Sequence, residues 1–514
     1  MASSLVRGRY VIARGIDRHT VEIIEDGAVF QRDGRVVEIG AYADLVARHA
    51  PDEVLGGPDT VVTPGFVNAH HHQGITPVQH GCQDLPLELW FAALMQSRDV
   101  DLYLDTLYSA FEMIESGVTT VQHLHGWMRG SASQVVDAVD RVFDAYRAVG
   151  MRVSFSYGLS DQCLLVYGDD QAFVAGLPAD LGRTLAAYFA ETGLPMAEQF
   201  GIFEHLYQRH NGAERARVQL APNNLHWCSD RAIEAMRAYA DRYRVPMHMH
   251  LLETPYQKEY ARRRTGGSAV EHLRRHGLLG PDLTLGHGVW MTEADIETVA
   301  ATGTRICHNA SSNLRLRSGI APLNAFEKRG VPVAIGMDEA GINDDRDMLQ
   351  EMRLVLKLHR TPGMDDAVPT SAQVFRMATE HGAATTGFAD EIGVLAPGRA
   401  ADMVLLDWRS IAYPYLNLDR DISVIDAVLH RARSSGVRAV MVAGETIYRD
   451  GRFTRIDKAA VLAELAAHMA RPLSDDERRN RALGQALMAH VRGFYDGWLD
   501  QESRRPFQRS SSRD

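Results

Sequence analysis

The stretch VVTPGFVNAHHH, residues 61–72, decides the fold class of this chain. An apolar run rich in β-branched residues passes through Pro64 and Gly65 and then delivers His70 and His72. In an extended segment, residues two apart point to the same side, so these two imidazoles can bind one ion from the end of a single strand. A histidine-rich surface loop is the alternative, but a buried-strand pattern that runs directly into the histidines argues against it. The stretch therefore predicts a metal site.

Three more apolar runs end in a side chain that can bind a metal. VPMHMH ends at His250, LTLGH ends at His287, and VPVAIGMD ends at Asp338. Glu253 follows His250 by three residues. Each run alone has an ordinary reading, a strand that stops at a polar residue on reaching solvent. Because imidazole and carboxylate are suitable ligands for zinc and neighbouring metals, the repeated pattern predicts that these strand ends share one site.

The order of extended and helical segments predicts a closed barrel. Strands that alternate with helices form a parallel sheet, and eight repeats close it into a (β/α)8 barrel, whose catalytic residues lie at the C-terminal ends of the strands. We expect helices at 101–116 and 131–149, which Gly117 and Gly150 would end. The expected strands are 61–69, 118–123, 152–157, 217–221, 245–250, 283–287, 304–308 and 331–337.

Motifs in the same order resemble the amidohydrolase superfamily. They are PGFVNAHHH, the HxxE of His250 and Glu253, the strand-ending His287, CHNASSN, GMDE, and the C-terminal GVLAPGRAADMV. The chain is most similar to the branch that holds cytosine, guanine and S-adenosylhomocysteine deaminases and the triazine hydrolases. The resemblance covers roughly residues 5–455.

The domain organisation follows from the barrel and from the resemblance. Residues 61–390 form the metal-dependent barrel, and the resemblance implies that residues 1–60 and 391–455 fold together into one small β-sandwich. Short strands with turn signals, Asp26-Gly27 and Asp33-Gly34, support this reading. Residues 456–514 read as a helical extension whose Ser/Arg-rich tip we expect to be disordered.

Composition fits a cytoplasmic enzyme that acts on a small molecule. The formal charge of −11 disfavours nucleic acid and anionic membranes as partners. We find no apolar run of the roughly 18 residues that a membrane helix needs, and the N-terminus lacks the apolar core of a secretion signal. The 4 cysteines are scattered, as in proteins of a reducing compartment. We also expect a homo-oligomer, a dimer or larger.

One divalent metal is expected at His70, His72, His250 and Asp338. Many barrels of the family hold two metals bridged by a carboxylated lysine on the fourth strand. Here that strand, VQLAP, has no lysine, so the sequence favours a single ion. Zinc is the first choice, with Fe2+, Co2+ and Ni2+ as alternatives.

The catalytic roles are expected at Asp338, Glu253 and His287. Asp338 can accept a proton from the attacking water as well as bind the metal, and Glu253 can carry a proton to the substrate nitrogen. A solvated surface glutamate is the ordinary reading of Glu253. His287 can ligate the metal or hydrogen-bond the reacting group, and we favour the second role. His71 and His248 alternate with the ligands, so they should point away from the metal and support it from behind.

Three residues beyond strand ends are candidates for contact with substrate. Gln73 and Trp90 follow the first strand, although Trp90 also reads as a core residue. His308 ends the seventh strand, and a plain structural histidine is an equally good reading.

Two departures from the family pattern point to the same cavity. Related deaminases carry a Pro-His pair after the fourth strand, where this chain has Pro222-Asn223. A small residue usually follows the metal aspartate, where this chain has Glu339. Both side chains should line the substrate pocket, unless Glu339 turns outward and pairs with a cation such as Arg346.

The sequence therefore predicts a metal-dependent hydrolase of a non-peptide C–N bond. Deamination of an aminated N-heterocycle is the first hypothesis. Cleavage of an aryl urea, carbamate or amide, or triazine chloro- or aminohydrolysis, are the alternatives. A catalytically silent barrel that serves in assembly is the rival from another class, but such a protein would be expected to lose ligands that this chain retains.

Overall fold

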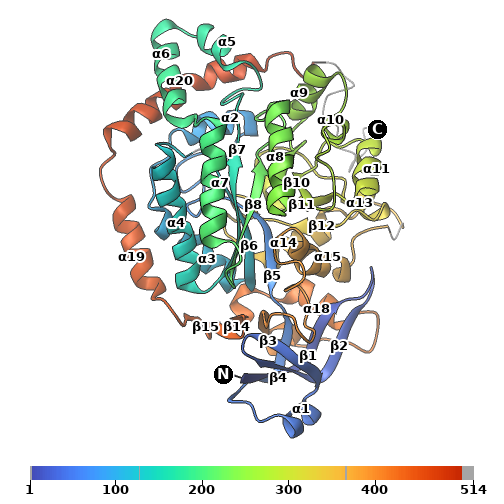
Figure 1. Cartoon of the computed structure of the whole chain (residues 1–514). Coiled ribbons are helices and arrows are strands. Elements are labelled where there is room, and N and C mark those ends of the chain that lie inside the picture. Colours follow the sequence, from blue (N-terminus) through green and yellow to red (C-terminus); the bar gives the residue numbers. More distant parts are fainter. Residues whose placement is uncertain (1–2, 127, 365–366, 501–514) are drawn as a thin grey trace.

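The computed structural model describes residues 3–126, 128–364 and 367–500, and within them eight parallel strands follow one another around a barrel (Figure 1). This confirms the predicted (β/α)8 class. The barrel strands are β5 (Phe66–His71), β6 (Val118–His125), β7 (Arg152–Leu159), β8 (Ala216–Pro222), β9 (Met247–Leu251), β10 (Leu283–His287), β11 (Arg305–His308) and β12 (Val333–Ile335).

The barrel closes between its first and last strands at the end that carries the polar residues. The backbone N–H of Asp338 donates to the carbonyl oxygen of His70 at 2.8 Å, and that of Met337 donates to the same oxygen at 3.2 Å. His71 and Asp338 also form a parallel β-bridge. The closure therefore brings the first and last predicted ligand segments together through the backbone.

The predicted first strand, 61–69, is in fact two strands. Its first half belongs to β4 (Glu53–Pro64) in a different sheet, and β5 begins after Gly65. A Cβ at Gly65 would lie 2.1 Å from the side chain of Thr119, so only glycine fits where the chain crosses into the barrel. Its N–H donates to the carbonyl oxygen of Asp402 at 3.0 Å, which fixes the crossing.

Both chain ends contribute to one further sheet, as predicted. β4 pairs in parallel with β1 (Ser3–Gly15) and antiparallel with β13 (Met403–Asp407). The order across the sheet is β16-β15-β14-β13-β4-β1-β2-β3. The remaining elements of this part are β2 (Val21–Arg32), β3 (Arg35–Ala41), α1 (Tyr42–Arg48), α17 (Trp408–Ala412), α18 (Val424–Arg431), η1 (Ser434–Gly436), β14 (Val437–Val442), β15 (Glu445–Arg449) and β16 (Arg452–Phe453).

One of the two predicted hairpin turns forms. Asp33 and Gly34 connect β2 to β3 with φ of 52° and 82°. Asp26-Gly27 instead lies inside β2, where the strand continues through it. The domain bounds proposed from the sequence stay a prediction.

Helices cover the outside of the barrel. The predicted helix 131–149 is α4 (Ala132–Val149), which begins at a Ser131 capping box and ends at Gly150, whose φ is 83°. The others around the barrel are α2 (Leu87–Leu94), α3 (Leu102–Glu115), α5 (Asp170–Ala175), α6 (Ala179–Thr192), α7 (Met196–His210), α8 (Asp230–Tyr243), α9 (Pro255–Thr265), α10 (Ala269–Arg275), α11 (Glu293–Thr302), α12 (Ala310–Arg315), α13 (Leu323–Lys328), α14 (Met348–Leu358), α15 (Ser371–Ala378) and α16 (Glu380–Ala384).

The C-terminal extension is helical in its described part and returns to the barrel. It forms α19 (Lys458–Met469) and α20 (Asp475–Phe494), and its Ser/Arg-rich tip lies outside the described residues. Figure 1 shows α20 beside α5 and α6 at one end of the barrel, with the sheet of the chain ends at the other. The catalytic end of the barrel is thus covered by segments far apart in sequence.

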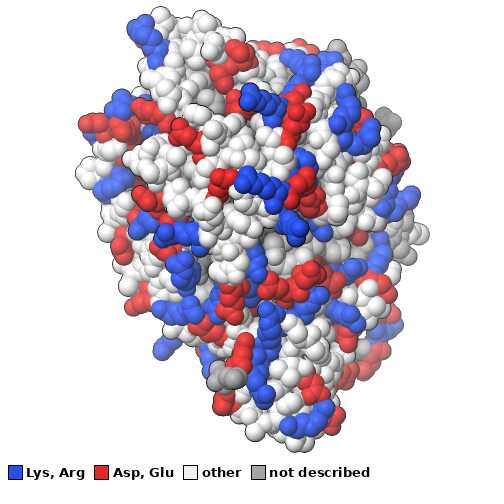
Figure 2. Space-filling model, viewed as in Figure 1, with Lys and Arg blue, Asp and Glu red and all other residues white. Residues whose placement is uncertain are grey.

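The surface carries no single dominant charge on the face drawn in Figure 2, where acidic and basic side chains are interspersed. Among the described residues, every helix is too short or too polar to cross a bilayer.

Candidate metal and active site

Four predicted ligands converge at the C-terminal end of the barrel. The Nε2 atom of His72 lies 3.1 Å from Nε2 of His70, 3.1 Å from Nε2 of His250 and 3.1 Å from Oδ1 of Asp338. His70 Nε2 and Asp338 Oδ1 are 3.6 Å apart. Tetrahedral zinc with bonds of about 2.0–2.1 Å separates its ligand atoms by about 3.3 Å. The three imidazoles and the carboxylate therefore fit one divalent ion.

The other ring nitrogens of these histidines hold the rings in place. His72 Nδ1 lies 2.7 Å from the carbonyl oxygen of Leu124, and His250 Nδ1 lies 2.8 Å from that of Asn223. His70 Nδ1 lies 2.9 Å from Nε2 of His248. Partners of this kind fix the tautomer of a metal-binding histidine and raise its basicity. His248 therefore supports the site from behind, in the position that strand alternation predicts for it.

The charges of the site suit a cation. Burial lowers the pKa of His250 to about 3 and that of His70 well below its usual value, so both present neutral imidazoles. Burial opposes the ionisation of Asp338, but the hydrogen bond and charge of His72 outweigh it and hold the pKa of this carboxyl well below its ordinary value. The same pairing raises the pKa of His72 to about 9 against the effect of its burial. A bound metal would replace that proton.

Asp338 is held in position by its backbone and by a serine. Its φ is 55°, an uncommon value for a non-glycine residue, and Ser312 donates to Oδ2 at 2.6 Å. Ser312 lies in α12, and the neighbouring Ser311 binds the buried carboxylate of Glu351 through its N–H and its hydroxyl. The CHNASSN motif is therefore the segment that orients the metal aspartate.

Glu253 and His287 lie together beside the ligands. His287 Nε2 is 3.7 Å from Oε2 of Glu253 and 3.9 Å from Oδ2 of Asp338, and its Nδ1 is 2.9 Å from Oδ1 of Asn313. Glu253 is 3% exposed, so it is not the solvated surface residue that its sequence context also allowed. Burial raises the pKa of its carboxyl, although His287 opposes the shift. A carboxyl whose pKa is raised binds a proton more tightly than an exposed one and can pass that proton on.

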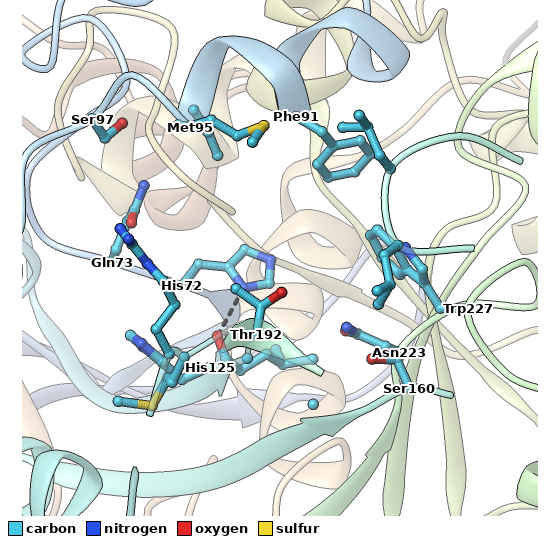
Figure 3. Close-up of a pocket in the computed structure, with 18 of the residues that line it drawn as sticks. His72, Gln73, Phe91, Met95, Ser97, His125, Ser160, Thr192, Asn223 and Trp227 are labelled. Atoms are coloured by element: carbon cyan, nitrogen blue, oxygen red, sulfur yellow. Dashed lines mark hydrogen bonds between the residues drawn. The ribbon is translucent and has the colours of Figure 1, made fainter. Parts of the chain in front are cut away.

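These residues open into a cavity of about 950 Å³. Gln73, Trp90, Asn223 and Glu339 line it, and contact of these four residues with a substrate stays a prediction. In Figure 3, His72 and Gln73 lie on one side of the cavity, and Phe91 and Trp227 lie on the other. The cavity thus has a polar floor and a largely aromatic wall.

The structure does not bring His308 to the cavity. Its Nε2 lies 2.8 Å from Nε2 of His359, at the end of α14. The preceding residue, Cys307, is buried against Ala69 and Ala334 inside the barrel, and successive side chains of a strand alternate. His308 therefore faces the helices. It is a structural histidine rather than a residue of the cavity.

Glu339 faces the cavity and does not pair with Arg346 through its side chain. Arg346 donates to the backbone oxygen of Glu339 at 3.0 Å and forms its ion pair with Glu112. Within the described part of the chain, Oε2 of Glu339 is buried without a hydrogen-bond partner. Burial raises the pKa of this carboxyl to about 7, opposed by His72. A buried acceptor of this kind is expected to find its partner in a bound molecule.

Sequence reasoning missed a second buried carboxylate next to the site. Glu88 in α2 accepts hydrogen bonds from the hydroxyls of Thr254, the neighbour of Glu253, and Tyr167. The Tyr167 N–H in turn donates to the hydroxyl of Tyr495, just after α20, at 3.0 Å. Glu88 therefore connects the segment of the proposed proton carrier to the C-terminal extension. In the sequence it reads as one polar residue of a short helix, and no local signal reveals it.

The outer wall of the cavity also escaped prediction because it is assembled from distant segments. α2 carries Trp90 and Phe91 into the cavity, and α20 packs directly on its other side, with Gly484 against Ala92 and Met95. Asp476 at the start of α20 reaches the cavity lining itself. The extension is thus part of the site.

Comparison with known proteins agrees with this geometry. The model of the amidohydrolase family matches residues 61–447. A 5-methylthioadenosine/S-adenosylhomocysteine deaminase of Nitratidesulfovibrio vulgaris is 31% identical over 448 residues, which span 86% of this chain and 92% of that protein. A crystal structure of an adenosine deaminase from Xanthomonas campestris with bound zinc superposes with a TM-score of 0.75 at 26% identity, covering 94% of this chain and 99% of that one.

A zinc complex of atrazine chlorohydrolase from Arthrobacter aurescens has a TM-score of 0.77 at 21% identity, covers 90% of this chain and 99% of its own, and shows the shared fold alone. The family match spans most of the chain, and the two deaminases among these relatives are named for the hydrolysis of C–N bonds other than peptide bonds. The chain belongs to the amidohydrolase family, as a metal-dependent hydrolase of such bonds.

Proposed function

We propose that this enzyme deaminates an aminated N-heterocycle, with one zinc ion held by His70, His72, His250 and Asp338. The observation that carries the proposal is that His72 Nε2 lies 3.1 Å from the Nε2 atoms of His70 and His250 and from Oδ1 of Asp338, beside a buried Glu253. The relative with bound zinc and the nitrogen-rich donor set support zinc among the divalent metals. The retained ligands argue against a catalytically silent barrel.

A divalent ion in this site would lower the pKa of a coordinated water from about 15.7 towards about 7 and so supply a nucleophile at neutral pH. The protein supplies the rest. Asp338 accepts a proton from the attacking water. Glu253, whose raised pKa lets it carry a proton, delivers one to the amino nitrogen, which leaves as ammonia while the ring carbon gains oxygen. His287, whose Nδ1 is held by Asn313, presents Nε2 beside Glu253 and Asp338 and hydrogen-bonds the reacting group there.

The cavity supports a neutral or cationic substrate that offers N–H donors. Glu339 contributes a buried carboxylate oxygen without a partner among the described residues, and Asn223 contributes an amide to the same lining. A carboxylated substrate would meet Asp338 and Glu339 together. The volume of about 950 Å³ is ample for a nucleoside, the class of molecule for which the deaminase relatives are named.

A second candidate, hydrolysis of an aryl urea, carbamate or amide, is favoured by the wall of the cavity. Trp90, Phe91, Met95 and Trp227 offer an apolar, aromatic surface that suits an aryl group. Asn223 stands where related deaminases carry histidine, so the usual contact with an aminated ring is altered. Triazine hydrolysis rests on likeness of fold and is the third option.

The homo-oligomeric state and the cytoplasmic location stay predictions from the sequence.

One screen separates the two leading reactions. Zinc-loaded protein is incubated with aminated purines, pyrimidines and triazines and with N-aryl ureas and anilides, and released ammonia and released arylamine are measured separately. Ammonia from an aminated ring supports deamination. Arylamine from a urea or anilide, without ammonia from any aminated ring, would replace deamination by the second candidate.

A further inference from the structure

A second group of metal-binding side chains lies outside the barrel, where α8, α9 and α10 meet. Asp230 is the first residue of α8, His272 lies in α10, and His276 directly follows α10. His272 Nε2 is 2.8 Å from Oδ1 of Asp230, and His276 Nε2 is 3.7 Å from Oδ2. One ligand atom from each of the three residues lies within 4.8 Å of the others. None of these residues lines the catalytic cavity.

The geometry turns both imidazoles towards the same carboxylate. His272 and His276 are four residues apart, a spacing that places side chains on one side of a helical turn, and their ring centroids are 4.6 Å apart. His276 Nδ1 lies 3.0 Å from Oε1 of Glu234, one turn along α8, so its Nε2 faces Asp230. A carboxylate on the distal nitrogen is the arrangement that orients metal-binding histidines.

The donor set has the chemistry of a zinc site. Two imidazoles four residues apart and one carboxylate are a ligand combination that binds zinc and leaves a position for water. Burial lowers the pKa of His272, although Asp230 opposes the shift, and this direction favours the neutral form of the ring that binds metals. Arg264 binds Oδ1 of Asp230 in an ion pair. Oδ2, on the side of His276, is the oxygen that faces the second imidazole.

We propose that Asp230, His272 and His276 bind a second divalent metal of the zinc class, separate from the catalytic ion, and that this site influences the substrate loop 223–229. Arg264 connects the two. The same guanidinium that pairs with Asp230 donates to the carbonyl oxygens of Leu225 and Cys228. A cation on Asp230 weakens the hold of Arg264 on that carboxylate and so loosens the loop that carries Asn223 and Trp227 into the cavity.

Zinc binding to the purified full-length enzyme tests the site directly. Equilibrium dialysis against zinc, with metal measured by atomic absorption, should give two equivalents per chain for the wild type and one for His276→Ala. His205→Ala, which removes an exposed histidine on α7, is the matched control and should keep both equivalents. Equal binding by the wild type and His276→Ala would overturn the proposal.

Two further arms keep this site distinct from the catalytic one. His70→Ala should lose the catalytic equivalent of zinc and retain the outer one. Loss of zinc from one site is thus distinguished from loss at the other. The influence on the loop is read in KM, which should rise in the wild type as the second equivalent binds and stay constant in His276→Ala. A second equivalent that leaves the wild-type KM unchanged would overturn the link to the loop.

Discussion

The imidazole rings of His72 and His250 are stacked, with centroids 5.2 Å apart, an interplanar angle of 11° and their Nε2 atoms 3.1 Å apart. His72 directly follows β5 and His250 lies in β9, and each ring is held by a backbone carbonyl oxygen at its Nδ1 atom. Two nitrogens turned towards each other at this distance share at most one proton, whereas a metal satisfies both lone pairs. The backbone of the barrel thus builds the donor set before any ion binds.

The first prediction separates the proton carrier from the metal ligands. Glu253→Gln should retain the metal content of the wild type, because Glu253 contacts His287 and Ser318 rather than the ligand centre. Turnover should fall by about 10²–10⁴-fold, the range for a positioned acid–base group. Metal content and kcat measured on one preparation check both statements. Loss of metal, or activity near that of the wild type, would remove Glu253 from the proposed role.

The second prediction concerns the charge of the pocket. Glu339→Gly removes a buried carboxylate beside the metal aspartate, so it should raise kcat/KM for anionic substrates relative to neutral ones. Asn223→His restores the histidine of related deaminases and should favour aminated rings over ureas. Both variants are compared with the wild type on one panel of neutral and anionic substrates. If the relative kcat/KM values stay those of the parent enzyme, neither residue sets specificity.

The third prediction tests the C-terminal extension as a wall of the cavity. A Cβ at Gly484 would lie 2.5 Å from the backbone oxygen of Ala92, so Gly484→Ala must push α20 away from α2. We expect a higher KM and a lower thermal midpoint, because α2 carries Trp90 and Phe91.

Gly493→Ala is the matched control in the same helix. Apart from the neighbouring residues and backbone of the helix itself, no atom of the described residues lies within 4 Å of the position that a Cβ would take there, and alanine favours a helix over glycine by about 0.5–1 kcal/mol. This variant should keep the wild-type KM. A wild-type KM in Gly484→Ala as well would show that α20 does not shape the site.

The fourth prediction is a dependence of stability on pH. Burial raises the pKa of Glu88 from 4.5 to about 7, although hydrogen bonds from Thr254 and Tyr167 oppose the shift. The folded state therefore holds this proton more tightly than the unfolded state, so the wild type loses stability as pH rises from about 4.5 to about 7. Over this pH range the free energy of unfolding falls by about 3 kcal/mol.

Glu88→Gln keeps the acceptor for both hydroxyls and removes the ionisation. Its thermal midpoint should exceed that of the wild type at pH 8, and the difference should shrink at pH 5. A difference of the same size at both pH values would contradict the assignment.

The sequence predicted the barrel and its ligand segments because both depend on local patterns. Each ligand follows an apolar run, and parallel strands of a barrel end on one face, so order along the chain was enough to place His250 and Asp338 near His70 and His72. The division of 61–69 was not visible, because the apolar run continues through Pro64 and Gly65. The point of division is set by contacts of Gly65 with Thr119 and Asp402, which are distant in sequence.

In short strands, the sequence was a weaker guide to whether a side chain points into the barrel or outward to the helices. β11 has 4 residues, and only the burial of Cys307 inside the barrel reveals that His308 points outward. Glu88 and Gly484 likewise gain their roles from elements that meet only in the folded chain. These are tertiary properties without a local signature.

The central claim is that one metal ion makes this chain a C–N hydrolase, and a zinc titration of metal-free protein tests it most directly. Ammonia release from an aminated heterocycle is measured as zinc is added to protein that carries His276→Ala, which removes the proposed outer site, with and without His250→Ala. We expect activity to rise linearly, reach its plateau at one equivalent per chain, and be absent from the protein that also carries His250→Ala. A plateau at two equivalents, or turnover by protein shown to be free of metal, would contradict the account.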